Sequence, residues 1–256
     1  GCPLDNSSEK IIQSVDRAIK ILRCFDNYEE LGVTEISKML NLHKSTTFGL
    51  VSTLHANGIL EQNENTGKYK LGLELYRLGT KVNLSLRTIV LPYLERLVEM
   101  YEETANLVVM QGLSVVYLEK VESSHSMRIS TSVGGRKPLY CTAVGKAILA
   151  HLPPDELNRK LDKMELVKFT DNTITCKDEL KKALIEIKEK GYAKDNEEME
   201  IGLCCIAAPI LNQYGYPIGA ISVSGPKSRM NSELDIKVGK ALVEFTMEIS
   251  KKLGYF

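Results

Sequence analysis

Three stretches in the second half of the chain carry residue types that could hold a small acid. The first runs from Pro138 to Lys146, PLYCTAVGK, and has the pattern of a strand that enters a helix through small residues. Free amides and the dipole at a helix start attract a carboxylate or a phosphate. We therefore expect an anion to lie at this turn, beside Tyr140, Thr142, Ala143 and Val144.

The other two stretches add a carboxyl group, a thiol and two hydroxyls. Asp195 stands at the end of one predicted strand, and Cys205 lies in the next one. In ISVSGP, Ser222 and Ser224 are two residues apart, so a strand presents both hydroxyls on the same face. Two hydroxyls beside a thiol can orient a small polar ligand. The carboxylates that follow Asp195, up to Glu200, are expected to form a solvated loop.

Catalysis by a cysteine and metal binding are alternative interpretations of these residues. Cys204 and Cys205 face opposite sides of a predicted strand, and no residue nearby in sequence could serve Cys205 as a base. The four histidines show no HExxH or comparable spacing. We predict no catalytic residue, no cofactor and no metal ligand. An enzyme with Cys205 as nucleophile, and a metal or redox sensor built on Cys141, Cys205 and Asp195, stay open as alternatives.

In the first part of the chain, a helix predicted from about Lys44 to Gly58 could enter a groove of DNA. Its inward side is formed by Thr47, Leu50, Val51 and Leu54. Its outward side, which could meet the major groove of B-DNA, carries Lys44, Ser45, Thr46, Phe48 and Ser52.

Each outward residue type suits a particular contact. The hydroxyls of Ser45 and Thr46 and the free amides of the first turn could bind phosphate, and Phe48 could meet a thymine methyl group. Thr34 stands at the start of the preceding predicted helix, over 34–40. Its hydroxyl could cap the first turn of that helix and face the DNA. Lys68, in a hairpin after the helix, could reach a neighbouring phosphate.

The charge of the chain supports DNA binding only locally. Lys and Arg number 33 and Asp and Glu also number 33, so the chain has no net charge. Between Glu35 and Glu61 there is no acidic residue, whereas two lysines and two histidines occur there. Affinity for DNA per protomer is therefore expected to be weak, which favours a dimer. A three-helix module that binds another protein is the alternative function for this part.

Hydrophobic periodicity predicts the elements that position these residues. Helices are expected over 13–25, 34–40 and 44–58, followed by strands at 59–62 and 68–71 that form a hairpin, or wing. Helical periodicity resumes from Leu73 to Val98 and contains the connection between domains. We place the boundary near Lys81, which gives a DNA-binding domain over 9–81 and a ligand-binding domain over 82–256.

The second domain alternates short strands with helices. Strands are predicted at 107–110, 115–121, 127–132, 203–211 and 217–223, and helices at 142–152, 178–190 and 232–253. Consecutive hairpin-like pairs indicate a largely antiparallel sheet with helices packed on it, which is an α+β fold.

The composition excludes several classes of protein. The chain of 256 residues has six cysteines without paired CxxC spacing, which argues against a secreted disulfide scaffold and against a structural zinc site. No apolar run approaches the roughly 20 residues of a membrane helix, and the first residues lack the order of a signal peptide. We expect a cytoplasmic, nucleoid-associated protein without a membrane partner.

From about Val15 to its C-terminus, the chain resembles the IclR family of bacterial transcriptional regulators. The matching stretches are SVDRAIKIL, VTEISKMLNLHKST, GKYKLGLELYRLG, TAVGKAILA, GYAKDNEEMEIGLCCIAAPI and AISVSGP. This resemblance implies a winged helix-turn-helix followed by a GAF-like domain that binds an effector. It also implies a dimer, or a tetramer formed as a dimer of dimers, that binds operator DNA, acts as a repressor and catalyses no reaction.

The resemblance also implies where the effector lies. In family members with a known ligand, a small organic acid contacts the positions of Ala143, Val144, Asp195, Cys205, Ser222 and Ser224 in this sequence. Two longer stretches, SMRISTSVGGRKPLYCTAVGK and KDNEEMEIGLCCIAAP, are most similar to the ketodeoxygluconate regulators, so a sugar acid is the expected effector. The chain departs from the family in having Gly49 where an arginine is usual and His43 where a proline is usual.

Overall fold

The computed structural model describes residues 11–81, 85–128 and 131–255. The chain divides into two compact units, Gly1–Leu84 and Ser85–Phe256, which we call the first and the second unit. The division falls three residues after the boundary predicted at Lys81, and residues 82–84 lie outside the described ones.

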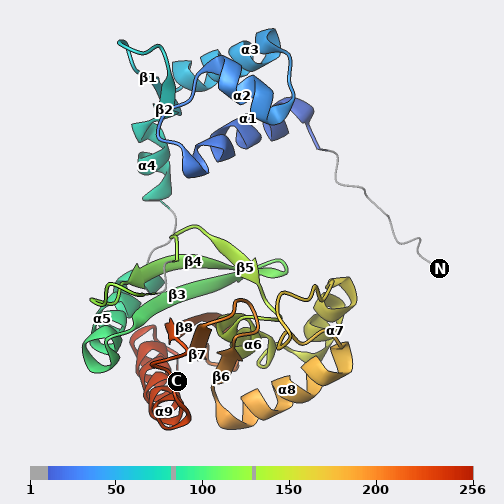
Figure 1. Ribbon diagram of the computed structural model, residues 1–256, viewed down its shortest axis with the longest axis vertical. Helices are drawn as coiled ribbons and strands as arrows, with labels where there is room; N and C mark the ends of the chain where they lie inside the picture. The colour runs from blue at the N-terminus through green and yellow to red at the C-terminus, as the bar shows by residue number, and fades with distance from the viewer. Residues whose placement is uncertain (1–10, 82–84, 129–130, 256) are drawn as a thin grey trace, which may run out of the picture. The chain divides into compact units, whose positions relative to one another are not determined.

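The first unit is a three-helix domain with a small antiparallel hairpin (Figure 1). Its elements are α1 Gln13–Arg23, the 3-10 helix η1 Cys24–Asn27, α2 Val33–Leu40, α3 Lys44–Ala56, β1 Leu60–Gln62, β2 Tyr69–Leu71 and α4 Leu73–Gly79. Its core is built around Ile21, Ile36, Val51 and Leu60, each fully buried. The predicted winged helix-turn-helix is confirmed, with β1 and β2 as the wing.

One local prediction for the first unit is wrong. Helix α2 begins at Val33, so Thr34 lies inside the helix and does not cap it. The cap position is Gly32, whose N–H donates to the Glu35 side chain at 2.7 Å. The helical periodicity predicted from Leu73 to Val98 corresponds to two helices, α4, which ends at Gly79, and α5 Ser85–Tyr101.

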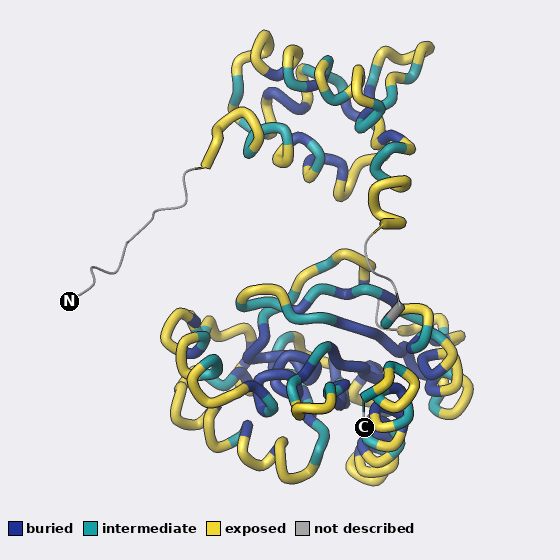
Figure 2. Tube along the Cα trace, turned by 180° about the vertical axis from the view of Figure 1, so that it is seen from behind, coloured by how far each residue is buried: buried dark blue, intermediate teal, exposed yellow. Residues whose placement is uncertain are grey.

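The second unit is built on one six-stranded antiparallel sheet in the order β5-β4-β3-β8-β7-β6, which confirms the α+β class. The strands are β3 Thr104–Gln111, β4 Ser114–Val121, β5 Arg136–Pro138, β6 Ala193–Asn196, β7 Leu203–Leu211 and β8 Pro217–Pro226. Figure 2 shows that β3, β7 and β8 are the most buried part of the unit. They form the centre of the sheet, where both faces are covered by helices.

Two groups of helices cover the two faces (Figure 1). They are α5 Ser85–Tyr101 and α9 Ser232–Lys252 on one face, and α6 Ala143–Leu149, α7 Pro154–Lys163 and α8 Lys177–Lys190 on the other. Alternate residues of a strand point to opposite faces. Accordingly, Ile221 and Val223 of β8 pack in the core with α5 and α9, whereas Ala220 packs in the core with α6.

The structure corrects the predicted elements of the second unit in three places. No strand forms among the described residues of 127–132, and the third strand is β5, which begins at Arg136; residues 129–130 lie outside the described ones. The helix predicted over 142–152 ends at Leu149. Helix α7 follows it and was not predicted. No helix in the described part of the chain is long and apolar enough to cross a membrane.

Candidate functional site

The outward side of α3 is the first candidate site. Lys44, Ser45, Thr46 and Phe48 are exposed, as predicted, and Ser52 is half-buried. A helix leaves its first N–H groups without a carbonyl of its own, so the amides at the start of α3 are oriented to bind an anion. The side chain of Phe48 is 57% exposed although it is large and apolar. Amides, hydroxyls and one apolar ring therefore lie together on one surface.

Buried residues on the other side of α3 hold this surface in place. Val51 and Thr47 are fully buried, and Val51 belongs to the core of the first unit. The Thr47 hydroxyl donates to the carbonyl of His43 at 3.1 Å, which fixes the first turn of the helix. The residues before and after Thr47 in the helix consequently face outward.

The two remaining predicted DNA contacts differ in their surroundings. Thr34 is exposed on α2. Lys68, directly before β2, forms an exposed ion pair with Glu35 at 3.2 Å, so its charge is partly neutralised. Exposed pairs of this kind contribute little stability, and a phosphate can compete for the lysine. Lys38 and Lys44 form no ion pair with any described residue, which leaves the charge of this surface positive.

The second candidate site is a cavity between the sheet and the start of α6, which we call the β7–β8 pocket. Seven of the eight predicted ligand residues line it, namely Thr142, Ala143, Val144, Asp195, Cys205, Ser222 and Ser224. The other lining residues are Tyr117, Lys137, Met199 and Leu203. The fold thus brings together predicted residues that are up to 82 positions apart, because β6, β7 and β8 are neighbours in the sheet.

Strand register explains this juxtaposition. Asp195 on β6 is opposite Cys205 on β7, and Cys205 is opposite Ser224 on β8. Side chains directly opposite each other in an antiparallel pair share a face. Ser222, two residues before Ser224, is on the same face and accepts a hydrogen bond from the Asn106 amide at 3.4 Å.

Tyr140 is the one predicted ligand residue that does not line the pocket. Its side chain is buried, and its hydroxyl donates to the carbonyl of Val167 at 2.7 Å. Thr142 does line the pocket, but its hydroxyl also caps α6 by accepting from the Gly145 amide at 3.2 Å. In this structure Tyr140 packs beside the pocket without lining it, and its contact with a ligand stays a prediction.

Asp195 is the buried acid of the pocket, with an exposed fraction of 1%. Its Oδ1 accepts a hydrogen bond from the Glu198 amide at 2.8 Å, and no described residue donates to Oδ2. Burial raises the pKa of this carboxyl to about 7, although the hydrogen bond from Glu198 acts in the opposite direction. Near neutral pH, Asp195 can therefore either accept or donate a proton.

A buried ion pair between Lys146 and Glu198 lies next to Asp195. Lys146 of α6 donates to both carboxylate oxygens of Glu198, at 2.8 and 2.6 Å, and to the carbonyl of Lys194 at 2.6 Å. The side chains of Lys146 and Glu198 are 5% and 8% exposed. The expectation that the carboxylates after Asp195 form a solvated loop is therefore wrong for Glu198. Through its ion pair with Lys146, the Glu198 side chain links the end of β6 to α6.

Lys137 is a pocket residue that the sequence interpretation missed. It lies on β5 and lines the cavity together with Asp195, Ser222 and Ser224. Its ammonium forms no ion pair with a described residue, and its nearest aromatic contact is the Tyr117 ring at 5.9 Å. A three-residue strand is too short for an alternating pattern, so nothing in GGRKP tells which of the two basic residues faces inward.

The thiols of the pocket region are poor nucleophiles. Burial raises the pKa of the Cys205 thiol, and it raises the pKa of Cys141 to about 12. The thiolate is the reactive form of cysteine. Among the described residues, no three His, Cys, Asp or Glu side chains come together as a metal site. These observations give no support to the two alternatives based on Cys141 and Cys205.

The β7–β8 pocket is narrow in this structure. The cavity has a volume of about 10 Å3, which holds about one water molecule. An acid with several heavy atoms requires the lining side chains to move apart. Lys137 and Met199 have the longest flexible side chains in the lining, so they are the residues expected to move.

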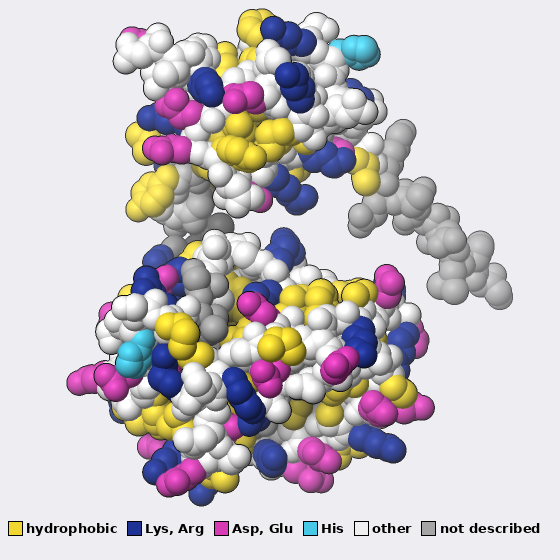
Figure 3. Space-filling model, viewed as in Figure 1, with side chains coloured by type: hydrophobic (Ala, Val, Ile, Leu, Met, Phe, Trp, Pro, Cys, Tyr) yellow, Lys and Arg dark blue, Asp and Glu magenta, His cyan; other side chains and the backbone are white. Residues whose placement is uncertain are grey.

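Apolar side chains gather on the surface of α1 (Figure 3). Ile12, Val15 and Ile19 are 65%, 55% and 46% exposed, and their spacing places them on one side of the helix. On α4, Leu73 and Tyr76 are each 75% exposed. The apolar side chains of α1 are thus only partly directed to the core, where Ile21 is buried. Contiguous exposed apolar patches mark interaction surfaces.

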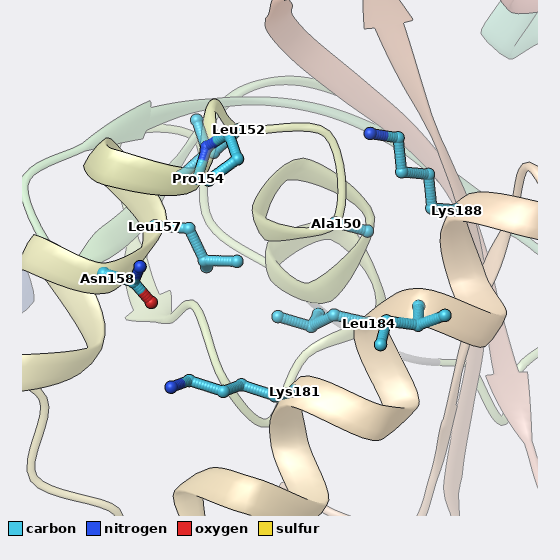
Figure 4. Close-up of a pocket in the computed structure, with 9 residues that line it drawn as sticks. Ala150, Leu152, Pro154, Leu157, Asn158, Lys181, Leu184 and Lys188 are labelled. Carbon is cyan, nitrogen blue, oxygen red and sulfur yellow. The ribbon is translucent and has the colours of Figure 1, made fainter.

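A larger hollow of about 270 Å3 lies between α7 and α8 (Figure 4). Its lining is apolar, with Leu157 and Leu184 on its two sides and Lys181 extending from α8 toward α7. It contains no carboxyl or hydroxyl side chain and none of the predicted ligand residues. This hollow is larger than the β7–β8 pocket, but the polar groups that could orient a hydroxylated acid are in the β7–β8 pocket.

The comparisons with known proteins identify both domains. Residues 14–64 match the IclR helix-turn-helix domain, and residues 80–251 match the C-terminal domain of the bacterial transcriptional regulator IclR. The HTH-type transcriptional regulator XynR of Escherichia coli is 36% identical over 248 residues, which cover 96% of this chain and 98% of that protein. The regulator KdgR of E. coli is 33% identical, with coverage of 95% and 94%.

A solved structure extends the similarity to the fold. The IclR homologue from Microbacterium hydrocarbonoxydans, complexed with 4-hydroxybenzoate, superimposes with a TM-score of 0.82 and 25% identity. The match covers 93% of this chain and 99% of that one. Both domain models match in the expected order, and the named relatives are regulators and not enzymes. This chain therefore belongs to the IclR family of bacterial transcriptional regulators.

Proposed function

We propose that this protein is a transcriptional repressor that binds operator DNA through α3 and responds to a small organic acid in the β7–β8 pocket. One observation carries the proposal: a single chain combines an exposed helix surface of amides, hydroxyls and cations with a separate pocket that contains an ammonium, a carboxyl and two hydroxyls. DNA phosphates need the first set of groups, and a hydroxylated acid needs the second.

The proposed effector is a sugar acid, with ketodeoxygluconate as the first compound to test. The hydroxyls of Ser222 and Ser224 suit a ligand that carries hydroxyls of its own. Similarity to KdgR supports this choice, and the 4-hydroxybenzoate complex of an IclR homologue supports an organic acid more generally. We propose the seven lining residues predicted from the sequence as its contacts.

The proposed assembly is a homodimer, or a tetramer of two dimers, in which a second copy covers the apolar surface of α1 and α4. That surface includes Ile12, Val15, Ile19, Leu73 and Tyr76. Two recognition helices in one dimer compensate for the weak binding of a single domain without net positive charge. Sedimentation equilibrium of the purified protein is expected to give at least twice the mass of one chain. A monomer at micromolar concentration would contradict this assembly.

The DNA-binding role is tested by a mobility-shift assay with DNA from upstream of the protein's own gene. Replacing Ser45 with glutamate places a carboxylate where α3 would meet a phosphate, so binding is expected to weaken at least tenfold, or by about 1.4 kcal/mol. The matched control is Gln213→Glu, which adds the same charge at an exposed turn of the second unit. This control is expected to bind like the wild type.

The same assay decides the regulatory part of the proposal. An acid that binds the folded protein raises its melting temperature, so a thermal-shift screen of ketodeoxygluconate, gluconate, pyruvate and 4-hydroxybenzoate selects the compound to add. The selected acid is expected to change the fraction of shifted DNA. Absence of any shift at low salt, with or without acids, would refute the proposed function.

A further inference from the structure

Lys137 is placed to determine which ligands the β7–β8 pocket accepts. It is the cation among the lining residues of this pocket, and it has no ionic partner among the described residues. Lys146, the other lysine close to Asp195, is fully engaged with Glu198 and with a carbonyl. An incoming carboxylate can therefore pair with Lys137 without breaking an existing ion pair.

Asp195 imposes a second condition on an acidic ligand. A carboxylate placed beside an ionised Asp195 would be repelled, because two negative charges would share one poorly solvated cavity. A protonated Asp195 has the opposite effect, since it can donate a hydrogen bond to a ligand oxygen. Its Oδ2 has no donor among the described residues and is free to carry that proton.

We propose that Lys137 pairs with the carboxylate of the effector and that Asp195 takes up a proton when the acid binds. The ligand class is then a small hydroxy or keto acid, whose carboxylate meets Lys137 and whose adjacent oxygen accepts from Asp195. Neutral sugars lack the group that Lys137 requires. This inference rests on the proposed effector role of the pocket and specifies its chemistry.

The groups around Asp195 are consistent with proton uptake at this residue. The titratable and charged side chains that face it are Glu198 of the same loop, Lys146 of α6, Lys137 of β5, Tyr117 of β4, Cys205 of β7 and Cys141 before α6. Burial raises the pKa values of Tyr117, Cys205 and Cys141 further above neutrality, so these groups stay protonated. Asp195, with a pKa of about 7, is the group that titrates in the neutral range.

The sign of the pH effect follows from this pKa. Well below pH 7, Asp195 already carries the proton, and binding of the acid needs no further one. Above pH 7 the proton must be taken from solution, so the dissociation constant rises with pH. For a pKa of about 7, the acid is expected to bind about tenfold more weakly at pH 8 than at pH 6.

Isothermal titration calorimetry of the full chain tests the proposal with ketodeoxygluconate, gluconate and pyruvate, and with glucose as the neutral comparison. Titrations in two buffers of different ionisation enthalpy count the protons bound. Nearly one proton per acid is expected at pH 8 and almost none at pH 5.5. Asp195→Asn, whose amide always donates, is expected to bind without proton uptake and with an affinity that does not change with pH.

The lysine is tested separately. Lys137→Gln is expected to lose at least tenfold in affinity for the acid, and Lys137→Arg is expected to recover most of it. The control Lys163→Gln removes an exposed lysine of α7 and is expected to change nothing. Melting temperatures of all variants show whether each one is folded.

The outcomes separate this inference from the proposed function. If an acid binds the wild type but Lys137→Gln binds it equally well, or no proton is taken up at pH 8, the inference is wrong and the effector role stands. If none of the acids binds at any pH from 5.5 to 8, both the effector role and the inference are wrong.

Discussion

Replacing Lys146 with methionine is expected to lower the free energy of unfolding of the second unit by about 3–5 kcal/mol. The substitution removes the cation from a buried pair and leaves the buried Glu198 carboxylate with the Asn196 amide, at 3.3 Å, as its remaining donor among the described residues, so ionisation becomes costly. It also removes the donor to the carbonyl of Lys194. Urea unfolding followed by circular dichroism measures the loss.

Two further variants test whether the loss comes from the unpaired charge. Lys168→Met breaks an exposed pair with Asp171, at 2.9 Å, and is expected to cost less than about 1 kcal/mol. The double variant Lys146→Met, Glu198→Leu removes both charges and is expected to recover much of the stability. A loss below 1 kcal/mol for Lys146→Met alone would show that the buried pair contributes little to the stability of the second unit.

Replacing Gly145 with alanine is the second change with a large expected effect. A Cβ atom at this position would lie 2.1 Å from the carbonyl oxygen of Leu139 and 2.5 Å from its Cα. Both are backbone atoms of the turn before α6, so no side chain can rotate to make room. We expect a loss of about 3 kcal/mol or more in the free energy of unfolding, because α6 must move away from the turn.

The matched control is the same substitution in α3. A Cβ atom on Gly49 meets nothing within 4 Å, and Gly49 lies inside an α-helix. Gly49→Ala is therefore expected to stabilise the first unit by about 1 kcal/mol, because alanine has the higher helix propensity. Thermal unfolding of both variants measures the opposite signs. Equal stability of Gly145→Ala and the wild type would contradict the close packing of α6 on this turn.

Periodicity was sufficient to predict the parts of the molecule in which one pattern runs over many residues. Helix α3 alternates inward and outward residues over more than three turns, so its exposed side followed from spacing alone. In the same way, the two-residue repeat in β8 placed Ser222 and Ser224 on one face. The pairing of β7 with β8 followed from the short turn that connects them.

Features that depend on distant parts of the chain were not predictable. Lys137 became a pocket residue because β5 pairs with β4 at the sheet edge, and three residues give no pattern to read. Glu198 is buried because Lys146, 52 positions away, pairs with it. Tyr140 stands next to pocket residues in sequence, yet its hydroxyl is bound to the carbonyl of Val167. Local sequence contains no sign of these partners.

The alternation along β8 has a mechanical consequence for regulation. Ser222 faces the β7–β8 pocket, while its neighbours Ile221 and Val223 pack in the core with α5, the helix that directly follows the division between the units. A rigid core transmits a displacement instead of absorbing it. If the proposed acid displaces this strand, the displacement would reach α5 directly, because Ile221 and Val223 share one core with that helix.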